Sequence, residues 1–176
     1  RRHRGTLNLH SQLLALKATA KIDSRNQYKN IVGSWQLSPV NLAEKGPVIA
    51  KTFQLPLPNT FNISAGKYQQ QGKFNLKNNN ISASASHKIS DLSIDNKELA
   101  IAGINSVSRS HYNNNQLSHS GKLKIAAINH AIAINNISAN FSLKNALCDK
   151  ISLSISKAKA TMLEAKLAMD DITIPL

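Results

Sequence analysis

The chain has 176 residues and a formal net charge of +13, from 22 Lys and Arg against 9 Asp and Glu. This length fits one domain, and the rhythmic placement of its 41% hydrophobic residues argues against a disordered chain. The longest apolar stretches are far shorter than the roughly 20 residues of a membrane-spanning helix, which excludes that class for this sequence. Because the sequence starts at Arg1, we expect residues 1–176 to be a single β-rich piece of a longer protein.

Alternation of apolar and polar residues is the first pattern along the chain. Leu14, Leu16, Ala18, Ala20 and Ile22 fall at every second position, with mostly polar residues between them. Successive side chains of a β-strand point to opposite faces of the sheet. Residues 14–22 therefore predict a long strand with one apolar face.

A short helix is predicted after this strand, at about residues 39–45 within the stretch 38–48. Ser38 can cap a helix, and Pro39 suits the first helical position. Gly46 and Pro47 are typical of a helix end.

Strand-like alternation recurs through the rest of the chain, and asparagine-rich turns separate several of the alternating runs. It recurs at residues 74–76, 81–85, 123–125, 141–143, 151–155 and 172–174. Asn78 to Asn80 and Asn113 to Asn115 lie between such runs, and Asn tolerates the left-handed backbone of tight turns. Residues 157–170 contain helix formers, but Leu163 and Leu167 follow the alternation, which favours a strand.

A repeated unit supports an elongated sheet. Residues 72–76 (Gly-Lys-Phe-Asn-Leu) resemble residues 121–125 (Gly-Lys-Leu-Lys-Ile), and a tyrosine precedes each, Tyr68 and Tyr112. Repeated hairpins of this kind build a sheet in which each unit contacts mainly its neighbours.

No pattern of catalytic or metal-binding residues stands out. The six histidines lack the short spacings of metal motifs, and Cys148 is the only cysteine. There is no Gly-x-Ser-x-Gly elbow or glycine-rich phosphate loop. Lysines are spread along the chain without interleaved aromatics, which disfavours nucleic-acid binding. We expect a protein that is not an enzyme and that needs no cofactor and no metal.

The apolar strand faces leave two architectures open. A sheet with one apolar face must cover that face. A closed β-sandwich does so with a second sheet, whereas a curled sheet can form a trough that a ligand fills. The alternation by itself fits both.

The order of several segments resembles the YdbH-type proteins of Gram-negative bacteria, relatives of the AsmA and TamB group. The segments that carry the resemblance are Gly33-Ser34-Trp35-Gln36-Leu37-Ser38-Pro39-Val40-Asn41-Leu42, Leu55-Pro56-Leu57-Pro58, Phe61-Asn62-Ile63-Ser64-Ala65-Gly66, Gly72-Lys73-Phe74-Asn75-Leu76, Leu99-Ala100-Ile101-Ala102-Gly103-Ile104, Gly121-Lys122-Leu123-Lys124-Ile125 and Ile132-Ala133-Ile134-Asn135-Asn136-Ile137. The similarity extends from about Gly5 to the end of the chain, and the Asn, Lys and Ser bias departs from the Gly, Leu and Trp richness of that family.

The resemblance implies a mainly β fold: an elongated, curled antiparallel sheet with an apolar groove and at most one or two short helices. It also implies a periplasmic location, a tether to the inner membrane, and a groove that passes phospholipid between the inner and outer membranes. Its partners would be phospholipid acyl chains and an outer-membrane or periplasmic protein, with no nucleic acid. The alternative is a closed β-sandwich that serves as a structural or adhesion domain and binds a protein.

On the groove interpretation, the apolar members of the alternating runs line the lipid path. These residues are Leu14, Leu16, Trp35, Leu37, Phe74, Leu76, Ile81, Leu123, Ile125, Ile132, Ile134, Phe141, Leu143, Ile151, Leu153 and Ile155.

Overall fold

A single antiparallel sheet makes up most of the computed structural model, which describes residues 2–11, 16–25, 28–52, 61–113, 115–144 and 151–175. Eleven strands and one helix, α1 (Leu42–Thr52), account for nearly all of these residues. The strands are β1 (Arg2–Ser11), β2 (Leu16–Arg25), β3 (Tyr28–Asn41), β4 (Asn62–Lys77), β5 (Asn80–Asp95), β6 (Ala100–Asn113), β7 (Gln116–Asn129), β8 (Ala133–Lys144), β9 (Ser152–Met162), β10 (Ala165–Met169) and β11 (Ile172–Pro175).

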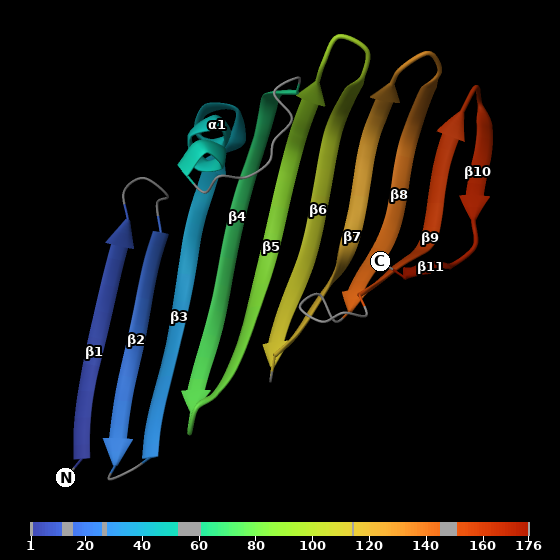
Figure 1. The fold of residues 1–176 in the computed structure, drawn as a ribbon. Helices are drawn as coiled ribbons and strands as arrows, with labels where there is room; N and C mark the ends of the chain where they lie inside the picture. Colours follow the sequence, from blue (N-terminus) through green and yellow to red (C-terminus); the bar gives the residue numbers. More distant parts are fainter. Residues whose placement is uncertain are drawn as a thin grey trace.

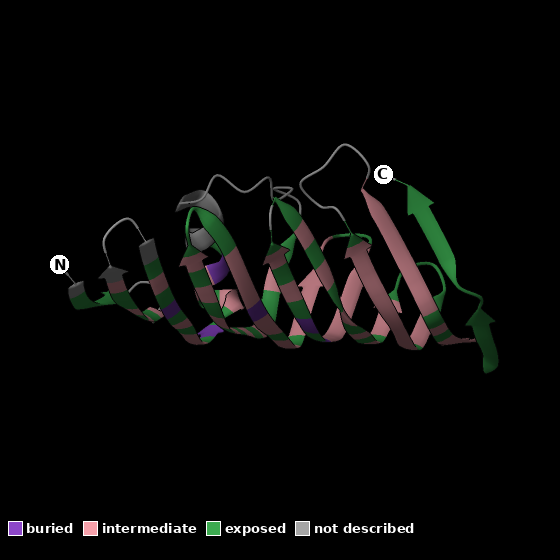
Figure 2. Cartoon of the chain, turned by 90° about the horizontal axis from the view of Figure 1, so that it is seen from below, coloured by how far each residue is buried: buried purple, intermediate pink, exposed green. Residues whose placement is uncertain are grey.

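Each strand from β1 to β9 pairs with the next one along the chain, and β11 pairs with β9 (Figure 1). The sheet does not close into a barrel, and β1 and β10 lie at its opposite ends. Figure 2 shows that the strands are bent, so that the sheet forms the curved wall of an open trough. The expected elongated and curled antiparallel sheet is confirmed. The described residues form no second sheet that would make a sandwich.

The strand register gathers the alternating apolar residues on one side of the sheet, here called the apolar face. Leu16 pairs with Leu37, Phe74 pairs with Ala83, and the same match continues to the C-terminal strands. Directly paired residues in a sheet share a face. The apolar face includes Leu7, Leu9, Leu16, Ala18, Ala20, Ile22, Ile31, Trp35, Leu37, Phe74, Leu76, Ile81, Ala83, Ala85, Leu123, Ile125, Ile137, Phe141, Leu143, Leu153, Ile155, Ile172 and Ile174.

The opposite side of the sheet, here called the polar face, carries the intervening residues. Its members include Lys17, Thr19, Ser34, Gln36, Lys73, Asn75, Ser84, Arg109, His111, Lys122, Ser142 and Ser154. Along β4 the polar-face residues from Lys67 to Lys77 are exposed, while the alternating residues from Tyr68 to Leu76 are half-buried. The apolar face is therefore the more sheltered of the two.

A line of irregular backbone positions crosses the middle strands. Gly66, Asp91, Gly103 and Asn136 all have positive φ, at 133°, 51°, 64° and 53°. The pairing of β4 with β5 shifts register beside Gly66, and the pairing of β5 with β6 shifts beside Asp91. A Cβ at Gly66 would lie 2.9 Å from the Cα of Leu92, which requires glycine there. Bulges of this kind bend and twist strands, so this line contributes to the curvature of the sheet.

The predicted asparagine turns are confirmed where the structure describes them. Asn78 and Asn79 have φ values of 48° and 66° and connect the paired residues Lys77 and Asn80. Two successive positive φ values define the type I′ turn that suits the twist of a two-residue hairpin. Asn115 likewise has φ of 63° beside the pair of Asn113 with Gln116. A further pair, Leu163 and Glu164 with φ of 47° and 68°, connects β9 to β10 and confirms strands rather than a helix in residues 157–170.

The turn at Asn79 makes a simple prediction for stability. Replacing Asn79 with glycine should raise the free energy of unfolding by several tenths of a kcal/mol, because glycine adopts positive φ without steric cost. Replacing it with valine should lower that free energy by about 1 kcal/mol or more. Urea denaturation followed by circular dichroism measures both. Equal midpoints for the two variants would contradict the turn assignment.

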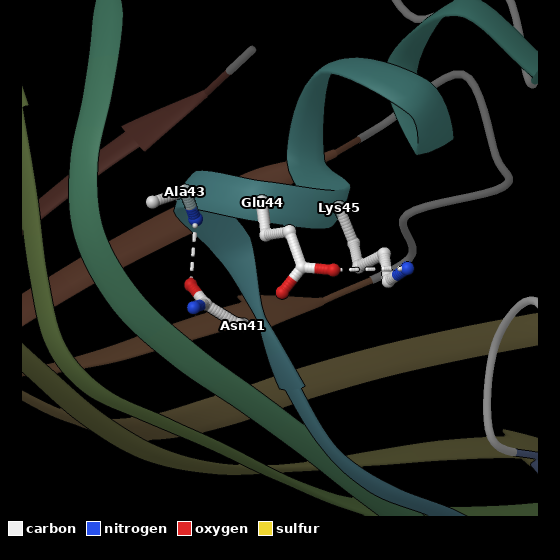
Figure 3. A network of polar contacts seen from close by, with 4 residues as sticks. All are labelled: Asn41, Ala43, Glu44 and Lys45. Carbon is white, nitrogen blue, oxygen red and sulfur yellow. Dashed lines mark hydrogen bonds and ion pairs between the residues drawn. The ribbon is translucent and has the colours of Figure 1, made fainter.

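The helix starts and ends later than residues 39–45, so those expected bounds need correction. β3 continues through Ser38, because Val40 and Asn41 still pair with Tyr68 and Lys67 of β4. Asn41 therefore takes the capping position, and its Oδ1 accepts a hydrogen bond of 3.1 Å from the Ala43 amide (Figure 3).

Gly46 and Pro47, which we expected to end the helix, lie inside it instead. Gly46 is buried, and a Cβ there would meet the side chain of Ile63 at 3.3 Å. Pro47 follows within the helix. The Glu44 and Lys45 side chains form an exposed ion pair of 3.1 Å. Contact of α1 with β3 and β4 holds the helix beside the strands despite the proline.

Candidate functional site

The apolar face has no layer of protein packed over it in the described part of the chain. Val40 and Ala85 are the only buried hydrophobic residues among those described, and no large side chain is fully buried. Leu7, Leu9 and Ile81 remain 60%, 53% and 48% exposed. Soluble monomers rarely expose contiguous apolar patches of more than a few hundred Å² unless the patch binds something. This face is therefore the candidate functional site.

Aromatic rings and glycines make the floor of this face over β3 and β4. The Trp35 ring covers Gly72 of the neighbouring strand, and the Phe74 ring covers Gly33. The two ring centroids lie 6.4 Å apart. A Cβ at either glycine would overlap the ring that covers it. Cross-strand aromatic cover of this type fills the space beside a strand glycine with apolar surface.

The structure places most of the predicted groove residues on the apolar face. These are Leu16, Trp35, Leu37, Phe74, Leu76, Ile81, Leu123, Ile125, Phe141, Leu143, Leu153 and Ile155. Ile134 lies beyond the irregular line, where it pairs with Ile128 and Met162. Ile151 directly precedes β9. Ile132 lies in the connection between β7 and β8 and is half exposed, so it is not placed on the strand face. Leu14 lies outside the described residues.

A polar band interrupts the apolar face at β6, and sequence reasoning missed it. β6 contributes Ser106, Ser108 and Ser110, which pair across to Ile89, His87 and Ala85 of β5. Ser106 and Ser108 are only 9% and 6% exposed. Buried hydroxyl groups cost free energy unless they are hydrogen-bonded.

A chain of three hydrogen bonds runs across this band from β4 to β7. Tyr68 Oη lies 2.9 Å from His87 Nδ1, and His87 Nε2 lies 2.9 Å from Ser110 Oγ. Ser110 Oγ also lies 2.8 Å from His119 Nδ1. Four side chains on four adjacent strands are thus joined into one network, here called the Tyr68–His119 chain.

The two imidazole rings of this network lie close to each other, and His119 also lies close to an aromatic ring of the apolar face. The centroids of the His87 and His119 rings are 5.3 Å apart, although a whole strand separates their backbones. His119 in turn lies 5.4 Å from the ring of Phe141. Partial burial lowers the pKa of both imidazoles, and at His87 a positive charge on His119 would lower the pKa further. Burial raises the pKa of the Tyr68 hydroxyl.

A signal for this network was present in the sequence. His87 follows Ala83 and Ala85 at every second position, and His119 follows Leu117 in the same way. Both imidazoles therefore stand at positions that the alternation assigns to the apolar face. In a sheet whose strands follow chain order, they must lie on one face two strands apart.

The lowered pKa values predict a loss of stability in acid. The unfolded chain has an ordinary histidine pKa near 6.5 and so binds more protons than the folded chain as the pH falls below that value. The free energy of unfolding should therefore decrease from about pH 6.5 downward, until the pH passes the lower pKa of the folded state. Urea midpoints between pH 8 and 5 measure this effect. The variant His119→Phe should show a flatter profile, and an unchanged slope would contradict the assignment.

Hollows in the described surface lie mainly on the polar face, not on the apolar one. One of about 540 Å³ is lined by Lys17, Thr19, Ser34, Trp35, Gln36, Gln71, Gly72, Lys73, Ser84, Ala85, Ser86, Arg109 and His111. Most of these residues are charged or polar. Such hollows suit water or polar groups and give no continuous apolar contact. We therefore take the broad apolar face, and not these hollows, as the candidate site.

Two other kinds of site are absent from the described ranges. These residues contain no group of three or more His, Cys, Asp or Glu side chains arranged to hold a metal ion. No helix among them is long and apolar enough to cross a bilayer.

Comparison with known proteins gives one match. Residues 2–176 match the family described as "YdbH-like: Intermembrane phospholipid transport protein YdbH". The searches of curated proteins and of solved structures found no match. The match covers nearly the whole chain, including every strand of the apolar face.

Proposed function

Because the chain belongs to the YdbH-like family of intermembrane phospholipid transport proteins, we propose that its apolar face carries phospholipid acyl chains along the trough between the inner and outer membranes. The observation that carries this proposal is the extent of the face, which runs from β1 to β11 with the polar band at β6 between its two apolar parts. Apolar residues match across neighbouring strands at both ends of the sheet, from Leu9 with Ala18 to Leu153 with Ile174. The described residues form no second sheet over it, and Leu7, Leu9 and Ile81 on this face stay exposed.

The energetics of lipid transfer explain why such a face is useful. Each methylene removed from water contributes about 0.8 kcal/mol, so transfer of an acyl chain of about 16 carbons into water costs roughly 12 kcal/mol of free energy. An apolar surface that accepts the chain offsets most of this cost at every step. The path needs no catalytic side chain, because no covalent bond changes.

The acyl-chain contacts are assigned to the residues predicted from the sequence. These are Leu14, Leu16, Trp35, Leu37, Phe74, Leu76, Ile81, Leu123, Ile125, Ile132, Ile134, Phe141, Leu143, Ile151, Leu153 and Ile155. In this arrangement the apolar face lines the inside of the trough, and headgroups stay toward its open side. The net charge of +13 favours anionic headgroups at the rim.

The location and partners follow from the same proposal. Transport between two membranes supports a periplasmic location. The proposal also includes a tether of the full-length protein in the inner membrane. Within the described residues, the outer edges of β1 and β10 have no strand beside them. Such edges can pair with further strands, which suits extension of the trough or docking of an outer-membrane or periplasmic partner.

Solvent extraction of the purified chain, followed by mass spectrometry, tests the proposal. We expect phospholipids to be enriched over their level in a control protein of equal charge purified in parallel. A chain that carries no phospholipid, and that also fails to bind a short-chain phospholipid added to it, would refute the proposal. Such a result would leave a β-sheet protein that binds another protein.

A further inference from the structure

Contact between acyl chains and apolar side chains does not explain the polar band that crosses the apolar face. A path that only needed to accept acyl chains would gain from leucine or alanine at these positions. Instead β6 supplies serines, and the Tyr68–His119 chain spans four strands. Trp35 and Phe74 lie on one side of the band, and Phe141 and Ile155 lie on the other.

A count of protons shows that the chain always keeps one donor for a ligand. Two hydroxyl groups and two neutral imidazoles carry four protons, and the three hydrogen bonds use three of them. If every bond runs from Tyr68 toward His119, the His119 Nε2–H stays free, and if every bond runs the other way, the Tyr68 hydroxyl stays free. If both imidazoles donate to Ser110, the Ser110 hydroxyl stays free. The chain therefore keeps one free donor in each arrangement.

The ligand that fits is an acceptor attached to an apolar body. On this face, the titratable groups beside the chain are Tyr68 from β4, His87 from β5, Tyr112 from β6 and His119 from β7, and β6 and β8 also contribute Ser110 and Phe141. Lys88, Arg109 and Lys122 alternate onto the polar face. An anionic acceptor here would meet hydrogen-bond donors without a fixed charge that would hold it too tightly.

We infer that the Tyr68–His119 chain and the β6 serines bind the phosphate-bearing headgroup of a phospholipid whose acyl chains lie on the apolar face. This inference rests on the proposed function and adds one station, at the polar band, where a headgroup that elsewhere stays toward the open side of the trough is held against the sheet. A phosphodiester accepts hydrogen bonds and donates none, and it would favour a proton on the imidazoles, which frees donors at both ends of the chain.

Three ligands and two signals separate the possible outcomes. Dihexanoyl phosphatidylglycerol has acyl chains and a phosphate, dihexanoylglycerol has only the chains, and glycerol 3-phosphate has only the phosphate. Trp35, the single tryptophan, lies on the apolar face, so its fluorescence reports acyl-chain contact. The NMR resonances of the His87 and His119 Cε1–H groups report headgroup contact.

We expect the phospholipid to change both signals and dihexanoylglycerol to change the Trp35 fluorescence alone. Glycerol 3-phosphate should shift the imidazole resonances weakly or not at all, and a shift as large as that of the phospholipid would identify a free-phosphate site and overturn the inference. Phospholipid binding that leaves both imidazoles unshifted would overturn this inference and leave the proposed function standing. If neither lipid changes the Trp35 fluorescence, the proposed function fails, and the inference fails with it.

Matched variants supply the second test. His119→Phe removes the end of the chain and keeps an apolar ring of similar size, whereas His111→Phe makes the same change on the polar face of β6. We expect His119→Phe to weaken binding of the phospholipid about tenfold, without weakening that of dihexanoylglycerol. His111→Phe should change neither affinity. Equal effects of the two variants would overturn the inference.

Discussion

Leu153→Glu should reduce the phospholipid that co-purifies with the chain by more than about tenfold. Leu153 lies on the apolar face of β9, where Leu143 and Ile174 are its direct partners. In the lipid-free protein the introduced carboxylate faces water, because nothing in the described chain covers this face. In the complex the carboxylate must lie against hydrocarbon. Binding then loses the contact of leucine with the acyl chain, about 2 kcal/mol, and also carries the free-energy cost of desolvating a charge.

The control for this variant introduces the same charge one residue away. Ser152→Glu places the carboxylate on the polar face, beside its strand partner Lys144. Mass spectrometry of solvent extracts should find wild-type levels of phospholipid in this control. Circular dichroism should show the same strand content for both variants. If both lose lipid equally, charge rather than the apolar face governs binding, and the assignment of the face is wrong.

Gly121→Val should be the most destabilising of the substitutions considered, with a loss of about 3 kcal/mol in the free energy of unfolding. Gly121 pairs with Ser108 of β6 and Phe141 of β8. A Cβ at this position would lie 2.6 Å from the carbonyl oxygen of Val107 and 2.8 Å from the Cα of Ser108. These atoms belong to backbone, so β6 and β7 would have to move apart.

Thermal unfolding followed by circular dichroism measures this effect, and we expect Tm to fall by roughly 10 °C. Gly5→Val is the matched control, because nothing lies within 4 Å of the Cβ that it would add on β1. That variant should be neutral or slightly stabilising, since valine suits a strand and restricts the unfolded chain. Similar Tm values for the two variants would contradict the close approach of β6 to Gly121.

Much of the apolar face could be predicted from the sequence, because a strand has a period of two. Once residues such as Phe74 and Leu153 are read as strand residues, alternation alone assigns them to one face. The helix bounds were less predictable. Ser38 has the chemistry of a helix cap, but pairing of β3 with β4 extends past it to Asn41. Long-range hydrogen bonds in the sheet decided that boundary over local preference.

The Tyr68–His119 chain shows what remained hidden. His87 and His119 are 32 positions apart, and each taken alone is an ordinary strand histidine. Only the order and register of β4 to β7 bring them to opposite sides of Ser110. A search for short histidine spacings could not detect a contact made across three strands.

The sequence by itself determined that this protein is a β-structure with one apolar and one polar side, since the alternation of side chains follows directly from strand geometry. The tertiary structure alone decided that the described residues form no second sheet over the apolar side, and that a polar band crosses it. The physical reason is that alternation acts within a strand, whereas cover and register depend on hydrogen bonds and packing between residues far apart in the chain.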